Sequence, residues 1–182
     1  VNGEPHLGHA YEKVLTDVLA FSRKRSPLLE DHDIRVVLDE TLKVSEERCL
    51  RQSVTVLRDY GNAGVVRVDK SHLRDAVERL IDNALDAMPA GGTLTVIADS
   101  ETVNGAPYVR VRIKDTGEGI PAEKMDKIFE PFFTTRITRK ATGLGLPIAK
   151  NIIEEEGGIL RIASAEKAGT TVTLLFPDLQ TA

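Results

Sequence analysis

One stretch of the chain places a carboxylate and two glycines directly after a predicted strand. Asp115 opens the sequence DTGEGI at residues 115–120, after a run in which apolar and basic residues alternate. A carboxylate at a strand end can accept a hydrogen bond from an amine group of a ligand. The glycines remove side chains where a flat ligand would touch the backbone. A glycine-containing turn without a ligand has the same composition, so this stretch alone leaves both interpretations open.

A second glycine-rich stretch, GLGLP at residues 143–147, leads into a predicted helix that Pro147 suits at its first turn. Exposed backbone N–H groups and the helix dipole make such a start a ready site for an anion. The preceding residues 134–142 are nearly devoid of apolar side chains but carry Arg136, Arg139 and Lys140. They predict a lid with phosphate-seeking cations, and a solvated loop is the alternative.

A third signal is the pair Asn83 and Asp86, at the edge of an apolar helical stripe. Their oxygen atoms suit Mg²⁺, which takes few protein ligands and keeps waters and nucleotide phosphates around it. A lone asparagine on a helix flank is usually just solvated. Together, the three signals indicate a site for a nucleoside triphosphate.

The elements that must position these residues follow from hydrophobic periodicity. Residues 72–88 carry a full buried stripe at helical spacing, with Ser71 as the expected N-cap. Further helices are expected at residues 34–51 and from Leu146 to Gly157. Strands are expected at residues 53–57, 65–68, 94–98, 108–114, 159–163 and 171–176. This mixed order predicts an α+β fold, a two-layer sandwich of helices on a mostly antiparallel sheet.

Composition narrows the class of protein. The chain has 182 residues, 41% of them hydrophobic, with a net charge of −4. It fits a globular domain without a general attraction to nucleic acid. The single cysteine, Cys49, excludes internal disulfides and fits a reducing compartment, so a cytoplasmic location is expected. No apolar run approaches the roughly 20 residues that cross a bilayer, and no signal peptide is visible. We therefore expect no membrane contact in this segment.

These motifs carry a resemblance to a known family. Residues 72–89 resemble the N box of the Bergerat-fold (GHKL) ATPases, the family of gyrase, Hsp90, MutL and the sensor histidine kinases. The segments 115–120 and 141–158 are similar to its two glycine boxes. Residues 128–135, IFEPFFTT, are similar to the F box of the histidine kinases. Four ordered motifs in matching context form a specific signal that spans about residues 21–177.

The resemblance implies ATP and Mg²⁺ as cofactors. It implies that Asp115 holds the adenine amino group, that Asn83 coordinates Mg²⁺, and that Thr171 lies near the base. The nucleotide-binding residues implied in this way are Asn83, Asp86, Asp115, Gly117, Gly119, Ile120, Phe132, Phe133, Thr134, Arg136, Thr142, Gly143, Leu144, Gly145, Leu146 and Thr171.

The chain departs from the family pattern at two positions, Arg79 and Ala141. Arg79 stands four residues before Asn83, where kinases usually have Asn and the hydrolytic relatives have Glu. We expect this cation to weaken Mg²⁺ coordination. Glu78 is one position off, and at about 100° per residue it is expected to point elsewhere. Ala141 replaces the glycine that commonly opens the second box, so a stiffer lid is expected.

We expect the first residues to form a separate segment, 1–27, ahead of a domain at 28–182. The sequence VNGEPHLGHAYEKVLTDVLA resembles the start of methionyl-tRNA synthetase, with His6 and His9 in its signature. Only about twenty residues match, without the catalytic domain that this signature serves. We expect a fused or truncated helix without chemistry of its own, in a chimera. Its apolar seam is Tyr11, Val14, Val18 and Phe21, which predicts a homodimer.

The expected function is that of the catalytic, ATP-binding domain of a two-component sensor histidine kinase. It would transfer the γ-phosphoryl group to a histidine of a dimerisation domain, with a response regulator as the later partner. No histidine of this chain has the context of a phosphoacceptor, so we expect no autophosphorylation of the segment alone. The alternatives are a catalytically silent nucleotide-binding or docking module and a chimeric protein. The F box disfavours a gyrase- or MutL-type ATPase.

Overall fold

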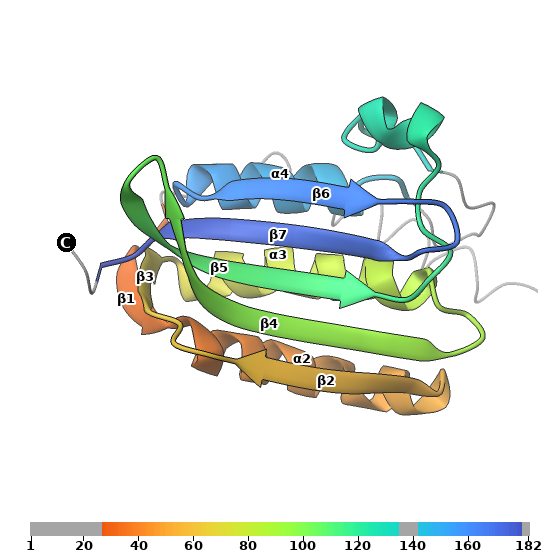
Figure 1. Cartoon of the computed structure of the whole chain (residues 1–182), viewed down its shortest axis with the longest axis horizontal. Helices are drawn as coiled ribbons and strands as arrows, with labels where there is room; N and C mark the ends of the chain where they lie inside the picture. The colour runs from red at the N-terminus through yellow and green to blue at the C-terminus, as the bar shows by residue number, and fades with distance from the viewer. Residues whose placement is uncertain (1–26, 135–141, 180–182) are drawn as a thin grey trace, which may run out of the picture.

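The computed structural model describes residues 27–134 and 142–179 and has a layer of helices on one face of a sheet. Five strands lie in the order β2-β4-β5-β7-β6, and β1 pairs with β3 in a separate ribbon. Figure 1 shows α2, α3 and α4 side by side behind the sheet. The bounds are β1 Glu30–Asp33, α2 Ile34–Arg51, β2 Val54–Tyr60, β3 Val65–Val68, α3 Lys70–Asp86, β4 Gly92–Val103, β5 Ala106–Asp115, a 3-10 helix η1 Ala122–Lys127, α4 Gly145–Glu155, β6 Ile159–Ser164 and β7 Thr170–Pro177.

The sheet is mostly antiparallel, as predicted, because only the β2–β4 pair is parallel within it. Along β5, Val109, Val111 and Ile113 are buried in the core. The intervening basic residues belong to the other face, because side chains alternate along a strand. There Arg110 lies opposite Asp99 on β4, with Nε 2.7 Å from Oδ1. The hydrogen bond from Arg110 lowers the pKa of Asp99.

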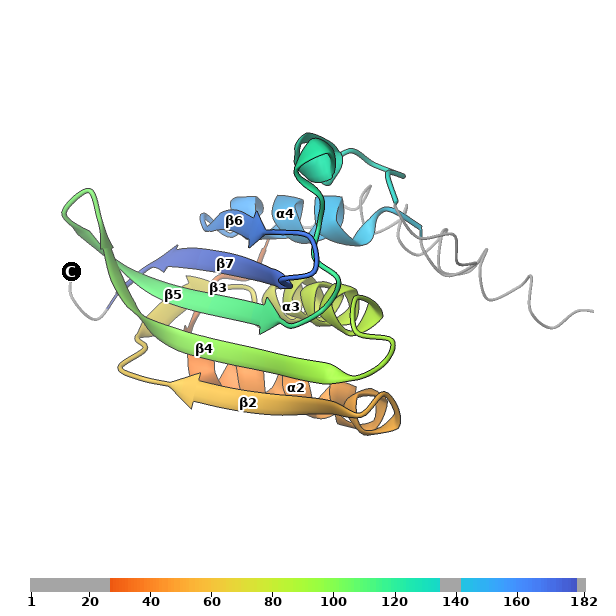
Figure 2. The same ribbon diagram turned by 45° about the vertical axis from the view of Figure 1, so that its right-hand side comes forward.

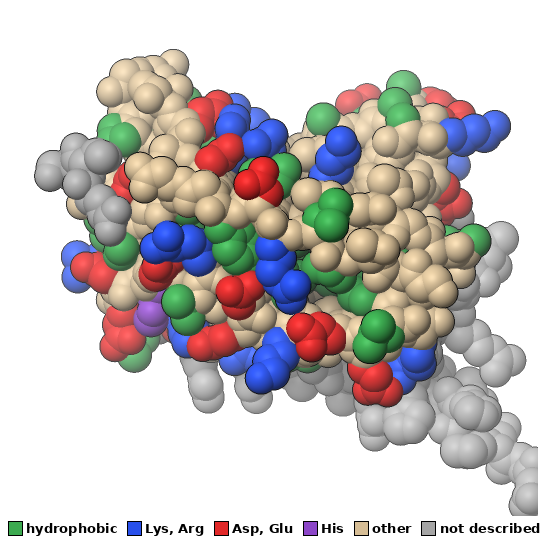
Figure 3. All heavy atoms as spheres, turned by 60° about the horizontal axis from the view of Figure 1, so that its bottom comes forward, with side chains coloured by type: hydrophobic (Ala, Val, Ile, Leu, Met, Phe, Trp, Pro, Cys, Tyr) green, Lys and Arg blue, Asp and Glu red, His purple; other side chains and the backbone are tan. Residues whose placement is uncertain are grey.

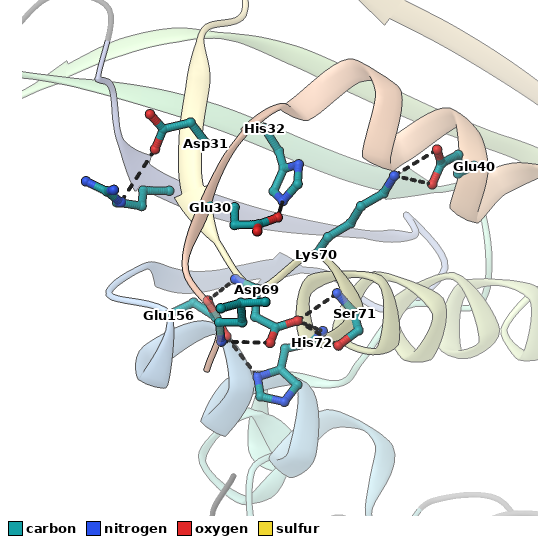
Figure 4. Close-up of polar contacts among 11 residues, drawn as sticks. Glu30, Asp31, His32, Glu40, Asp69, Lys70, Ser71, His72 and Glu156 are labelled. Atoms are coloured by element: carbon teal, nitrogen blue, oxygen red, sulfur yellow. Dashed lines mark hydrogen bonds and ion pairs between the residues drawn. The ribbon is translucent and has the colours of Figure 1, made fainter. Parts of the chain in front are cut away.

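The central helix is α3, which packs against both α2 and α4. Its stripe at Leu73, Leu80, Ile81 and Leu85 is completely buried, as the periodicity predicts. The predicted N-cap was wrong, because the helix begins two residues earlier and Asp69 caps it. Asp69 Oδ1 accepts the N–H groups of Ser71 and His72, at 2.9 and 3.3 Å (Figure 4).

Two elements were not predicted. Strand β1 has the sequence EDHD, which lacks the apolar alternation that marks a strand, and it forms by pairing with β3. The 3-10 helix η1 has the sequence AEKMDK and no buried residue, so it lacks the apolar periodicity that would predict a helix. Figure 2 shows η1 at the end of the sheet where β5 ends and α4 begins. The connection from β5 toward α4 therefore lies at that end of the sheet.

Charges of both signs are interspersed over the face that carries α2 and β2 (Figure 3). Arg58 of β2 lies 3.2 Å from Asp39 and 3.4 Å from Glu46, both of which belong to α2. Among the helices that the structure describes, none has the length and apolar character to cross a membrane. The proposed N-terminal segment 1–27, with its seam, falls almost wholly outside the described residues.

Candidate functional site

A cavity of about 950 Å³ opens where α3, the start of α4 and the ends of the strands meet. Its lining includes polar groups on α3, glycines before α4, and an apolar wall. That wall is built by Ile113 of β5, Ile162 of β6 and Val172 of β7. A concave apolar site with a few convergent polar groups is the usual form of a small-molecule site.

Asp115 closes β5 and is buried at this cavity, with 4% of its surface exposed. Its Oδ1 accepts the N–H of Gly117 at 2.8 Å and the N–H of Thr170 at 3.2 Å. A buried carboxylate is tolerated only when hydrogen bonds compensate its lost hydration. These backbone donors hold the carboxylate in one orientation at the wall of the cavity.

The first glycine box is packed against the protein itself. A Cβ on Gly117 would lie 2.6 Å from Cβ of Ala87, and a Cβ on Gly119 would lie 1.9 Å from the carbonyl oxygen of Ala165. Gly119 also has a φ of +67°, which favours glycine. The expected ligand contact accounts for only part of this motif, because Gly119 lines the cavity and Gly117 does not. The box joins the end of α3 to the turn before β7.

The second glycine box brings the start of α4 against Asn83. A Cβ on Gly145 would be 3.5 Å from Asn83 Oδ1, an ordinary contact distance. No side chain caps the helix at its N-cap residue Leu144, whose own N–H donates to the Thr142 hydroxyl at 3.3 Å. Both Asn83 and Gly145 line the cavity. The start of α4 and the Asn83 side chain therefore border the same space, and the first N–H groups of a helix suit phosphate.

The F box meets this second glycine box directly. Phe132 donates its N–H to the carbonyl oxygen of Gly143 at 3.0 Å, and both residues have a φ of +67°. Phe133 and Thr134 line the cavity, whereas the Phe132 residue is 64% exposed. The backbone of Phe132 thus joins the F box to the second glycine box, and the residue itself is largely exposed.

Two charged residues of α3, Asp86 and Glu78, differ from the sequence-based expectation. Asp86 was expected to serve Mg²⁺ and nucleotide binding, and it lines the cavity but forms an ion pair with Arg48 of α2. Arg48 also lies 2.5 Å from Asp82. Glu78 lines the cavity as well, so the expectation that it points elsewhere was wrong. The cavity is wide enough to include adjacent positions of α3, so the rotation of about 100° between residues 78 and 79 does not exclude Glu78. Arg79 is a third lining residue, and its Nε is 3.0 Å from Asp75 Oδ1.

Most of the predicted site residues meet at this cavity. Those that line it are Asn83, Asp86, Asp115, Gly119, Ile120, Phe133, Thr134, Thr142, Gly143, Gly145 and Leu146. Those described elsewhere are Gly117, Phe132, Leu144 and Thr171. Thr170 takes the place expected for Thr171, because successive side chains of β7 face opposite sides of the sheet. Arg136 and Ala141 lie outside the described residues.

Sequence reasoning missed the contribution of α2. Arg48, Arg51 and Gln52, at the end of this helix, line the cavity. No motif marks them, and only the packing of α2 beside α3 brings them there. The sequence did contain a signal for the apolar wall, because Ile113 lies on the apolar side of the alternating strand at residues 108–114.

The few oxygen ligands at the cavity suit a metal ion that is coordinated mainly by the phosphates of a bound nucleotide. Within residues 27–134 and 142–179, no cluster of three or more His, Cys, Asp or Glu side chains could hold a metal by itself. Asn83 offers an amide oxygen beside the amides of α4. This fits Mg²⁺, which binds through few protein ligands and shares its coordination with nucleotide phosphates.

Comparison with known proteins agrees with this geometry. Residues 68–180 match the family described as "Histidine kinase-, DNA gyrase B-, and HSP90-like ATPase". Sensor kinase CckA of Brucella abortus (strain 2308) is 35% identical over 178 residues, 91% of this chain and 19% of the relative. A mycobacterial sensor histidine kinase, MprB, has a structure with a TM-score of 0.69 and 28% identity, covering 83% of this chain and 98% of that one.

A further solved structure is that of histidine kinase ThkA in complex with the response regulator protein TrrA. Its TM-score is 0.76 at 23% identity, covering 99% of this chain and 54% of that one. This likeness shows the shared fold. The chain spans about a fifth to two fifths of the first curated relatives, 19%, 37% and 27% of their lengths.

The predicted fold class and the predicted resemblance are both confirmed. The family match covers the N box, both glycine boxes and the F box, and the sheet with helices on one face has the architecture of solved histidine kinase domains. From its matched region and its fold, the chain belongs to the family of histidine kinase-, DNA gyrase B- and HSP90-like ATPases.

Proposed function

We propose that this chain is the ATP-binding catalytic domain of a two-component sensor histidine kinase. The observation that carries the proposal is that one cavity joins Asp115 at the end of β5 to Asn83 of α3 and to Gly145 at the start of α4. Such a cavity offers an acceptor for a base amine at one side and anion-binding amides at the other. The relatives named sensor kinases support the same assignment.

In the proposed complex, Asp115 accepts the amino group of adenine. Its carboxylate is already oriented by the N–H groups of Gly117 and Thr170, so binding does not require it to reorganise. The apolar wall of Ile113, Ile162 and Val172 excludes water from the base. The backbone from Gly143 to Gly145 binds the phosphates.

The proposed reaction is the transfer of the γ-phosphoryl group to a histidine of a dimerisation domain. An imidazole nitrogen attacks the γ-phosphorus, the bond between that phosphorus and the bridging oxygen breaks, and ADP leaves with the electron pair. Mg²⁺, held in part by Asn83, would neutralise the phosphate charge when bound. Catalysis of this kind rests mainly on positioning and electrostatic stabilisation. The domain's own task is to hold the nucleotide with its γ-phosphate exposed to the acceptor.

The proposed partners follow from the same assignment. They are a histidine-bearing dimerisation domain, a response regulator of the kind bound in the ThkA complex, and a second copy of this chain. The dimer rests on the apolar seam at Tyr11, Val14, Val18 and Phe21, outside the described residues. A cytoplasmic location is part of this proposal.

Calorimetric titration with ATP tests the base contact. Asp115→Asn keeps the shape but replaces a full acceptor by a mixed donor and acceptor, so we expect ATP affinity to fall by about 1.5–3 kcal/mol. Asp59→Asn is the matched control, because Asp59 is exposed on β2 and does not line the cavity. Equal ATP affinity in both variants would contradict the assignment of Asp115.

Labelled ATP tests the transfer. We expect the chain alone to stay unlabelled and a supplied dimerisation hairpin with its histidine to become labelled in trans. Acid-labile label on His6, His9, His32 or His72 would contradict the first expectation. ATP binding without any transfer to several such hairpins would favour the alternative, a catalytically silent nucleotide-binding or docking module.

A further inference from the structure

The cavity continues along α3 beyond Asn83, and this extension holds an arginine. The lining runs from Ala87, beside the first glycine box, back to Asp75 in the N-terminal half of the helix. The eight residue steps from Arg79 to Ala87 span about 12 Å at 1.5 Å per residue. The cavity is thus long enough to take a base at Ala87 and a polyphosphate chain that extends past Asn83 toward Arg79.

Arg79 lies on the same face of α3 as Asn83, because residues four apart in a helix are neighbours. Its side chain is only 14% exposed, whereas its partner Asp75 is 41% exposed. The 3.0 Å contact between Arg79 Nε and Asp75 Oδ1 sets the direction of the guanidinium. Asp75 is thus the outer member of this pair, and the cation is the inner one.

The neighbouring charges make the cation necessary if an anion is to enter. Two acidic residues, Asp75 and Glu78, also line this end of the cavity. Arg48, at the other flank of α3, pairs with Asp82 and Asp86. Without Arg79, the end beyond Asn83 would repel a terminal phosphate.

We propose that Arg79 contacts the terminal phosphate of the bound nucleotide, so that it selects triphosphate over diphosphate and takes over part of the charge neutralisation that Mg²⁺ provides. This inference rests on the proposed function, because it assumes that an adenine nucleotide occupies the cavity. A guanidinium suits the role, since its planar fork of donors matches phosphate oxygens and stays charged at every physiological pH.

The test compares the affinities for ATP and ADP, each measured by calorimetry with Mg²⁺ and with a chelator. Arg79→Gln removes the charge and keeps a side chain of moderate length. We expect its ATP affinity to fall about tenfold or more, the size of one charged hydrogen bond, and its ADP affinity to change less than about twofold. Arg79→Lys should recover part of the ATP affinity. In the unmodified chain, ATP binding should depend less on Mg²⁺ than in Arg79→Asn.

Arg67→Gln is the matched control, because Arg67 of β3 does not line the cavity, and its side chain is 61% exposed and pairs with Asp31. It should leave the ratio of ATP to ADP affinity unchanged. Circular dichroism of each variant checks that the fold persists. An unchanged ratio in folded Arg79→Gln would overturn this inference and leave the proposed function standing. A chain that binds neither nucleotide would overturn both.

Discussion

Gly117 lies so close to Ala87 that a Cβ on the glycine would be 2.6 Å from both the Cβ and the carbonyl oxygen of the alanine. This contact seats the loop after β5 on the end of α3. The next residue strengthens it, because Glu118 donates its N–H to the Ala87 carbonyl at 3.2 Å. Gly117 also donates its own N–H to Asp115. One position therefore couples helix packing to the orientation of the proposed base-binding carboxylate.

Gly117→Ala should lower the free energy of unfolding by about 1–3 kcal/mol, because the added methyl group has no space beside Ala87. It should also weaken ATP binding, since the shifted loop would turn Asp115. Denaturant unfolding and calorimetry measure the two effects. The control is Gly61→Ala, where a Cβ meets nothing closer than 3.7 Å. Equal stability of the two variants would show that the loop yields without cost.

The lowered pKa of the Asp69 carboxyl leads us to expect that the protein loses stability in acid. Burial alone would raise the pKa of its carboxyl, but the hydrogen bonds from the Ser71 hydroxyl and three backbone N–H groups lower the pKa to about 2. The ordinary value is near 3.9, so the charged form stabilises the fold above about pH 4. This contribution is lost as the pH falls through about 2.

Asp69→Ala should therefore cost about 0.5–2 kcal/mol of unfolding free energy at pH 7, the usual worth of an N-cap. The cost should shrink as the pH approaches 2, because the unmodified carboxyl is then protonated as well. Urea unfolding of both proteins at several pH values measures the difference. A cost that stays constant down to pH 2 would show that the carboxylate charge contributes nothing.

Glu156 ties the end of α4 to the start of α3. Its side chain is 0% exposed, and its two oxygens contact the Asp69 N–H at 2.7 Å and His72 Nδ1 at 3.0 Å (Figure 4). Glu156→Gln places an NH₂ group against one of these partners, so unfolding free energy should fall by about 1–3 kcal/mol. The exposed Glu166→Gln serves as the control. Equal stability of the two variants would contradict this role of the buried carboxylate.

Hydrophobic periodicity predicted the core of the fold, because long buried stripes such as that of α3 leave few alternatives. It did not predict β1, because this strand forms only by pairing with β3, which is distant in the sequence. It placed the N-cap of α3 at Ser71 instead of Asp69, because an apolar stripe marks the buried face of a helix and does not mark its first residue. The glycine boxes were found as motifs, but only the folded chain shows that Gly117 meets Ala87. The contribution of Arg48 depends on how two helices pack, which no local pattern encodes.

Alanine variants of Gly143 and Gly157 distinguish the effect of a steric clash from the effect of backbone strain. Gly143 and Gly157 have similar φ angles, +67° and +76°, so alanine is strained at both. A Cβ on Gly143 would lie 2.5 Å from the backbone carbon of Phe132, whereas a Cβ on Gly157 meets nothing within 4 Å. Any effect seen only at Gly143 therefore comes from the contact between the second glycine box and the F box.

Gly143→Ala should weaken ATP binding by about tenfold, because displacing Phe132 moves the amides at the start of α4 away from Asn83 by a fraction of an ångström, enough to lengthen charged hydrogen bonds. Gly157→Ala should lower stability less than Gly143→Ala, because it adds backbone strain without a clash. It should leave ATP affinity unchanged, since Gly157 lies at the opposite end of α4. Calorimetry and denaturant unfolding of both variants give the comparison. If both lose the same ATP affinity, the loss reflects general strain in α4, and the contact with Phe132 has no part in shaping the phosphate site.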